Sequence, residues 1–182
     1  REGEDELFIR AISKHLKRAN AQSNELDPEV LFFLIPRHPQ RFDEVANMLA
    51  KAGISFVRRS ELADKGGTAS SSLRLCSQTA VLLGDSLGEM PRYYAASQIA
   101  IVAGSFLPLG GQNLIEACAI GTPVLVGPHT KNFEQAVADA LDEGAALRAP
   151  NPEAALQLAL QLVNDPQRLK KMGQAGSHWV QK

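Results

Sequence analysis

Cysteine is scarce in this sequence of 182 residues: only Cys76 and Cys118 occur, and they lie far apart. Neither belongs to a CxxC pair or to a cysteine–histidine pattern with metal-ligand spacing. The sequence therefore indicates no zinc site and no disulfide framework. We interpret both residues as reduced thiols of a cytosolic protein.

Long apolar runs and an excess of one charge are also absent. The longest apolar run, residues 30–35, is far shorter than the ~20 residues of a membrane-spanning helix. The opening residues do not have the pattern of a signal peptide. The 19 lysine and arginine residues nearly balance the 20 aspartate and glutamate residues, so no overall field attracts nucleic acid or anionic lipid. We expect a soluble chain that binds no nucleic acid and does not insert into a membrane.

Length and composition are those of one globular domain, with 45% hydrophobic and 21% charged residues. The sequence opens on Arg1 and stops at Lys182, within a helical pattern. We expect residues 1–182 to be a single domain of a longer protein.

Apolar runs alternate with amphipathic helical patterns along the chain, which predicts an α/β fold. The unbroken run at 30–35 predicts a strand that is buried on both faces, as in a parallel sheet. Asn151-Pro152 and Asp165-Pro166 each predict a capped helix start. Right-handed crossovers then predict a Rossmann-like parallel sheet with helices on both faces. The predicted strands are residues 30–35, 55–58, 79–83, 99–103, 124–126 and 145–148. Residues 59–78 have no apolar period and predict an exposed, mobile loop.

Three clusters follow predicted strands, where parallel sheets bind their ligands. In the first, PRHP at 36–39, the Arg37 guanidinium matches a phosphate or carboxylate, although an ordinary surface arginine is an equal alternative. In the second, GDSLGEM at 84–90, the glycines allow a ligand close approach, and Met90 suits a flat base. The alternative for the second cluster is a plain turn, with Asp85 as a helix cap.

The third cluster is GGQNLIE at 110–116, after a strand that ends at Gly104-Ser105. A glycine pair that opens a helix presents N–H groups to a phosphate. Glu116, one turn into the predicted helix, suits ribose hydroxyls, and the alternative role is to complement the helix dipole. Clusters at successive strand ends predict a single crevice.

Together these motifs resemble the C-terminal domain of the 3-deoxy-D-manno-octulosonic acid (Kdo) transferases, which build the inner core of lipopolysaccharide. The matching segments follow the family's order: REGE at 1–4, PRHP at 36–39, GDSLGEM at 84–90, YYAA at 93–96, GGQNLIE at 110–116 and GPHTKNF at 127–133. The last of these is the most specific to the family, whereas the glycine-opened helix is shared more widely among GT-B transferases.

The resemblance implies one half of a GT-B architecture, the half that binds the donor CMP-Kdo. It further implies inverting, metal-independent transfer of Kdo to a lipid A precursor without a cofactor. The catalytic base and the acceptor groove belong to the family's N-terminal domain, so we expect no catalytic residue here and no transfer by this chain alone. The resemblance places the full-length enzyme at the cytoplasmic face of the inner membrane.

By the same resemblance, Pro36 and Arg37 contact the CMP phosphate and base, and Glu116 contacts the ribose. Gln112 stands where the family usually has histidine, and glutamine can donate a hydrogen bond but cannot carry a charge. The complete set of expected nucleotide contacts is Pro36, Arg37, Leu87, Gly88, Glu89, Met90, Gly111, Asn113, Leu114, Ile115 and Glu116.

Three alternatives remain open at this point. One is a GT-B enzyme that uses a UDP-sugar, and another is a nucleotide-binding module without transferase activity. The third, a dinucleotide-dependent oxidoreductase, would need a GxGxxG segment after a strand, which this sequence does not have.

Overall fold

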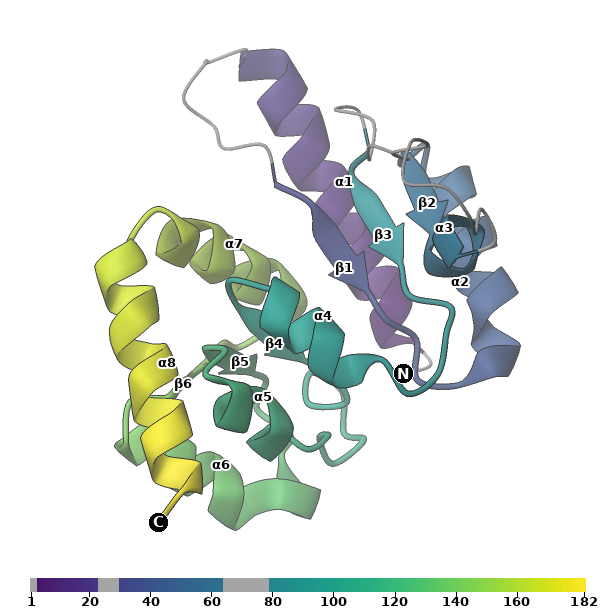
Figure 1. The fold of residues 1–182 in the computed structure, drawn as a ribbon. Coiled ribbons are helices and arrows are strands. Elements are labelled where there is room, and N and C mark those ends of the chain that lie inside the picture. Colours follow the sequence, from purple (N-terminus) through teal and green to yellow (C-terminus); the bar gives the residue numbers. More distant parts are fainter. Residues whose placement is uncertain (1–2, 23–29, 64–78) are drawn as a thin grey trace. The chain divides into compact units, whose positions relative to one another are not determined.

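The computed structural model describes residues 3–22, 30–63 and 79–182 (Figure 1). The chain divides into two compact units, each with a three-stranded parallel sheet. Ile9–Gly88 form the N-terminal unit, and the residues up to Phe8 together with Glu89–Lys182 form the C-terminal unit. The predicted α/β class with parallel strands is confirmed, and the strands pair in two sheets, β1-β3-β2 and β4-β5-β6.

The N-terminal unit is built around β3 (Val81–Leu83), which pairs in parallel with both other strands of its sheet. All of β3 is buried, whereas β1 is half-buried, so the strand predicted to be buried on both faces is not the deepest one. The reason is the strand order, which puts the later strand in the middle. The other elements are α1 (Glu4–Gln22, in this unit from Ile9), β1 (Phe32–Leu34), the 3₁₀ helix η1 (Pro39–Arg41), α2 (Phe42–Lys51), β2 (Phe56–Arg58) and α3 (Arg59–Ala63).

The predicted loop at 59–78 is wrong at its beginning, because Arg59–Ala63 form the short helix α3. Its first turn is held by a hydrogen-bond partner far along the chain, Asp85. The rest of that prediction, residues 64–78, lies outside the described residues.

The C-terminal unit is built around β5 (Val124–Val126), which lies between β4 (Ala100–Val102) and β6 (Ala146–Arg148). The other elements are α4 (Met90–Ala96), α5 (Ile115–Ile120), the 3₁₀ helix η2 (Lys131–Phe133), α6 (Glu134–Asp142), α7 (Pro152–Val163) and α8 (Pro166–Val180).

Alternation along β5 directs its side chains to two separate cores. Val124 and Val126 pack with buried residues of α5 and α6 on one face of the sheet. Leu125 packs on the other face with buried residues of α7 and α8. Helices therefore cover both faces of this sheet, as predicted.

Helices α5 and α8 approach each other backbone to backbone, and Figure 1 shows α8 in yellow at the C-terminal end of the chain. Gly121 ends α5 with φ of 89°, and a Cβ on Gly173 would lie 2.2 Å from the Gly121 carbonyl oxygen. Near the next turn of α8, a Cβ on Gly176 would lie 3.3 Å from atoms of Cys118. Only glycine fits at Gly173 without a displacement of one of the two helices.

Both predicted helix caps in this unit are confirmed. The Asn151 side chain accepts a hydrogen bond from the Ala154 N–H at 2.9 Å. The Asp165 side chain does the same for the Arg168 N–H at 3.0 Å. In the described part of the chain, no helix has the length and apolar character needed to cross a membrane.

Candidate functional site

The first predicted cluster, residues 36–39, follows β1 in the N-terminal unit. Pro36 is buried, and Arg37 is exposed. Within the described ranges, no residue forms an ion pair or a side-chain hydrogen bond with Arg37. The guanidinium group is therefore available to an anionic ligand.

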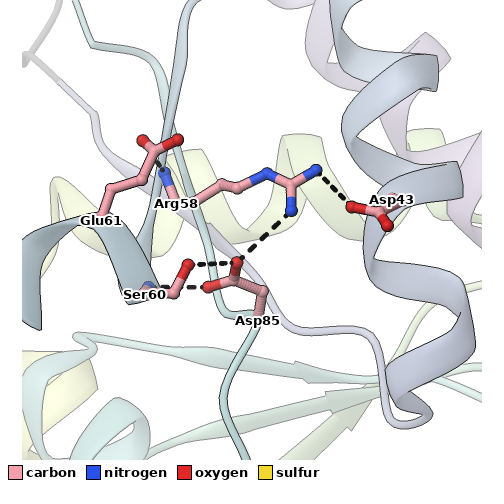
Figure 2. Close-up of polar contacts among 5 residues, drawn as sticks. All are labelled: Asp43, Arg58, Ser60, Glu61 and Asp85. Carbon is pink, nitrogen blue, oxygen red and sulfur yellow. Dashed lines mark hydrogen bonds and ion pairs between the residues drawn. The ribbon is translucent and has the colours of Figure 1, made fainter. Parts of the chain in front are cut away.

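In the second cluster, the Asp85 side chain accepts hydrogen bonds from the beginning of α3 (Figure 2). The Ser60 N–H donates to Asp85 Oδ1 at 2.8 Å, and the Ser60 hydroxyl donates to Oδ2 at 2.6 Å. The Asp85 side chain is only 4% exposed. The predicted alternative, that Asp85 is a helix cap, is correct in kind, but the capped helix precedes Asp85 in the sequence.

Arg58, the last residue of β2, links two carboxylates in the same network (Figure 2). Its Nη1 lies 3.7 Å from Asp85 Oδ2, and its Nη2 donates to Asp43 Oδ1 at 2.7 Å. The two acidic partners differ in burial, because the Asp43 side chain is 83% exposed. The network fixes the start of the 84–90 segment to β2 and α3.

The tip of the 84–90 segment is open. Leu87 is 67% exposed, which is unusual for a large apolar side chain. Gly88 has φ of 77°, and no atom lies within 4 Å of the position that its Cβ would occupy. Glu89, at the start of α4, accepts a hydrogen bond from Arg92 at 3.2 Å. The 84–90 segment is therefore anchored at its start and exposes an apolar side chain at its tip, where a ligand can contact it.

In the third cluster, the sequence pattern predicts a helix over about residues 112–120, and the helix starts later than that. Gly110 and Gly111 have φ of 87° and 82°, left-handed values that no α-helix contains. Helix α5 begins at Ile115, whose N–H donates to Asn113 Oδ1 at 2.9 Å. The glycine pair therefore forms a turn that precedes α5 and does not open it, and Glu116 lies in the first turn of the helix.

The predicted contacts of this cluster differ in what they offer. Leu114 is completely buried in the core beside β5, and Gly111 is buried as well. No atom of Leu114 is exposed to a ligand, so the predicted contact with this residue stays a prediction. Asn113, Ile115 and Glu116 are exposed and present their side chains.

The loop after β4 is tied to residues 127–129 through Ser105, which is 1% exposed. The Gly127 N–H donates to Ser105 Oγ at 2.8 Å, and the His129 N–H donates to the Ser105 carbonyl at 2.8 Å. The His129 side chain is exposed. In the sequence, Ser105 stands out only as a small polar residue directly after a strand.

Burial raises the pKa of two side chains, one on the inner face of α5 and one on α4. Desolvation raises the pKa of the Cys118 thiol to about 11, so this thiol is neutral at physiological pH. The pKa of Tyr94 is raised to about 12, first by burial and then by the negative charge of Glu116. Among the described residues, no group of three or more histidine, cysteine, aspartate or glutamate side chains could hold a metal ion.

The predicted contacts lie in both units. Pro36, Arg37, Leu87 and Gly88 belong to the N-terminal unit, and Glu89, Met90 and those of residues 111–116 belong to the C-terminal unit. A single crevice shared by all of them stays a prediction.

Comparison with known proteins identifies the family. Residues 63–179 match the family described as "Glycosyl transferases group 1". The chain belongs to this family. The matched range includes every predicted nucleotide contact except Pro36 and Arg37.

The predicted resemblance to Kdo transferases is confirmed. The chain is 52% identical over 180 residues to the 3-deoxy-D-manno-octulosonic acid transferase of Bordetella pertussis, covering 99% of this chain and 39% of the relative. It is 34% identical over 177 residues to the Haemophilus influenzae transferase of the same name, covering 96% of this chain and 37% of the relative. The chain therefore spans about two fifths of the length of these relatives.

A solved structure covers the whole chain. The crystal structure of the C-terminal CMP-Kdo binding domain of WaaA from Acinetobacter baumannii matches with a TM-score of 0.82 and 27% identity. The match covers 100% of this chain and 86% of that one. The predicted fold class, that of a GT-B half, is confirmed.

The two carboxylates that share Arg58 predict unequal contributions to stability. Asp85→Ala removes two hydrogen bonds to a charged acceptor and should lower the free energy of unfolding by about 1.5–3 kcal/mol. Asp43→Ala breaks an exposed ion pair and should cost less than about 1 kcal/mol. Urea denaturation of the two variants and the wild type measures the difference. Equal losses would contradict the assignment of Asp85 as the anchor of α3.

Proposed function

We propose that this chain is the donor-binding half of an inverting glycosyltransferase that transfers Kdo from CMP-Kdo to a lipid A precursor. The main support is the match of the entire chain to a domain that binds CMP-Kdo, at a TM-score of 0.82. The 52% identity to a Kdo transferase over almost the whole chain supports the same donor.

The exposed candidates have the chemistry that a nucleotide needs. The planar Arg37 guanidinium suits the phosphate of CMP, with Pro36 beside it. The apolar Leu87 and Met90 suit the face of the base, and the open space beside Gly88 admits a close approach of the ligand. Gly111 is the buried member of the proposed contacts. Glu116 suits the ribose hydroxyls, with Asn113 and Ile115 next to it on the surface. Glu89 and Leu114 complete the set of proposed contacts.

The other parts of the reaction belong to the remainder of the full-length enzyme in this proposal. The lipid A precursor binds to an N-terminal domain, which also supplies the catalytic base, at the cytoplasmic face of the inner membrane. Transfer requires neither a metal ion nor a cofactor. Gln112 can donate a hydrogen bond to the donor, but it cannot serve as an acid.

We expect the chain to bind CMP more tightly than UMP and to bind no NAD. Cytosine presents an amino donor where uracil presents a carbonyl acceptor, and a mispaired group costs about 1–3 kcal/mol. The preference should therefore be at least about fivefold. Isothermal titration calorimetry with the three nucleotides tests this expectation. Equal or tighter binding of UMP would favour a UDP-sugar donor.

Arg37→Ala should weaken CMP binding by about 1.5–3 kcal/mol, the range for hydrogen bonds to charged groups. Arg37→Lys should recover only part of this loss, because the planar fork of donors is missing. Arg168→Ala removes the same charge from an exposed position on α8 and serves as the matched control. Unchanged CMP affinity in the alanine variant at Arg37 would rule out the phosphate contact.

The chain alone should transfer no sugar, because transfer needs a base within about 3 Å of the acceptor hydroxyl proton. It also needs the acceptor aligned against the anomeric carbon. The purified chain is incubated with CMP-Kdo, generated in situ, and a lipid A precursor, and products are sought by mass spectrometry. Product above the control without enzyme would mean that the base lies within these residues, and Glu89 and His129 would then be the first candidates.

A further inference from the structure

The REGE motif at 1–4, which ends on the first residue of α1, has no part in the proposed contacts. Its Glu4 is fully buried, with 0% of its surface exposed. The Glu4 carboxylate accepts backbone hydrogen bonds from the loop that follows β4. The Phe106 and Leu107 N–H groups donate to Oε1 at 2.7 and 3.0 Å. The Gly104 N–H donates to Oε2.

Three N–H groups can meet one carboxylate only if the loop turns around it. A buried carboxylate is costly unless it is well hydrogen-bonded, and bonds from N–H to a charged oxygen are strong. Gly104 supplies the left-handed turn, with φ of 78°. The shape of residues 104–107 is therefore linked to the presence of a charged acceptor beneath them.

Two apolar contacts fix the same loop to the same helix start. The rings of Phe8 and Phe106 pack edge to face, with centroids 5.3 Å apart and planes at 88°. Gly3 adopts φ of 84°, and a Cβ there would lie 3.1 Å from Leu107 Cδ1. The start of α1 thus holds this loop by charge, by ring packing and by a close backbone approach.

The far side of the loop leads to the proposed donor contacts. The Gly111 N–H donates to the Gly104 carbonyl at 2.6 Å, and Gly111 is itself a proposed contact. Asn113 and the first turn of α5 follow within a few residues. A shift of Gly104 relative to Glu4 would therefore also displace Gly111 and the proposed contacts that follow it.

We propose that Glu4 is a positioning residue for donor binding: its carboxylate sets the loop at 104–107 and, through Gly111, the approach to α5. This role rests on the proposed function. It does not require Glu4 to touch the nucleotide. It predicts that donor affinity, and not only stability, depends on the Glu4 charge.

Glu4→Gln tests the role, because the amide keeps the length of the side chain but replaces one acceptor oxygen by a donor. The substitution should displace the loop that leads to Gly111, so we expect the dissociation constant for CMP to rise about tenfold, which corresponds to about 1.4 kcal/mol. Glu6→Gln removes an equal charge from the same first turn at an exposed position and should leave CMP affinity unchanged. Calorimetry well below each variant's melting temperature measures the affinities.

Amide NMR supplies a second measurement on the wild-type chain, so the test does not depend on the folding of the variant. Addition of CMP should slow hydrogen exchange at Gly104, Phe106 and Leu107, with no change at buried amides of α7. Unaltered exchange there, or equal CMP affinity of the wild type and a folded Glu4→Gln variant, would overturn the role of Glu4 alone. A wild-type chain that does not bind CMP would overturn the proposed function and this role together.

Discussion

Burial of the two central strands, β3 and β5, is the constraint on which the other features depend. All six of their residues are apolar and buried, so neither strand can carry a ligand-binding side chain along its length. Polar chemistry is confined to the loops beyond the strand ends, as is usual for parallel sheets. The cluster at 84–90 begins directly after β3, and the segment at 127–133 begins directly after β5, for this reason.

Two buried carboxylates hold the backbone near these loops in place. Asp85 accepts hydrogen bonds from Ser60, and Glu4 accepts them from the loop after β4. In each case the carboxylate orders backbone that belongs to a distant part of the sequence. Leu87 and Glu116, by contrast, are exposed. Neither acid needs to react in order to matter for the site.

Local signals predicted the regular elements well. The strand at 124–126 agrees to the residue, and the caps at Asn151 and Asp165 form as expected, because each depends on neighbours within a few positions. Helix α3 escaped prediction because its cap, Asp85, lies 25 residues away. The start of α5 was placed too early, at about residue 112, because the sequence pattern does not show that the Asn113 side chain accepts the Ile115 N–H. The candidate residues came from sequence motifs. The hydrogen bond between Glu4 and Gly104 joins residues 100 positions apart, so no local sequence pattern predicts it.

The glycine contact between α5 and α8 has a mechanical consequence. Where side chains separate two helices, a rotamer change can absorb a small displacement of either one. No side chain separates Gly121 from Gly173. A tilt of α8 therefore displaces the end of α5 directly. Helix α5, which carries Ile115 and Glu116, is therefore expected to move together with α8.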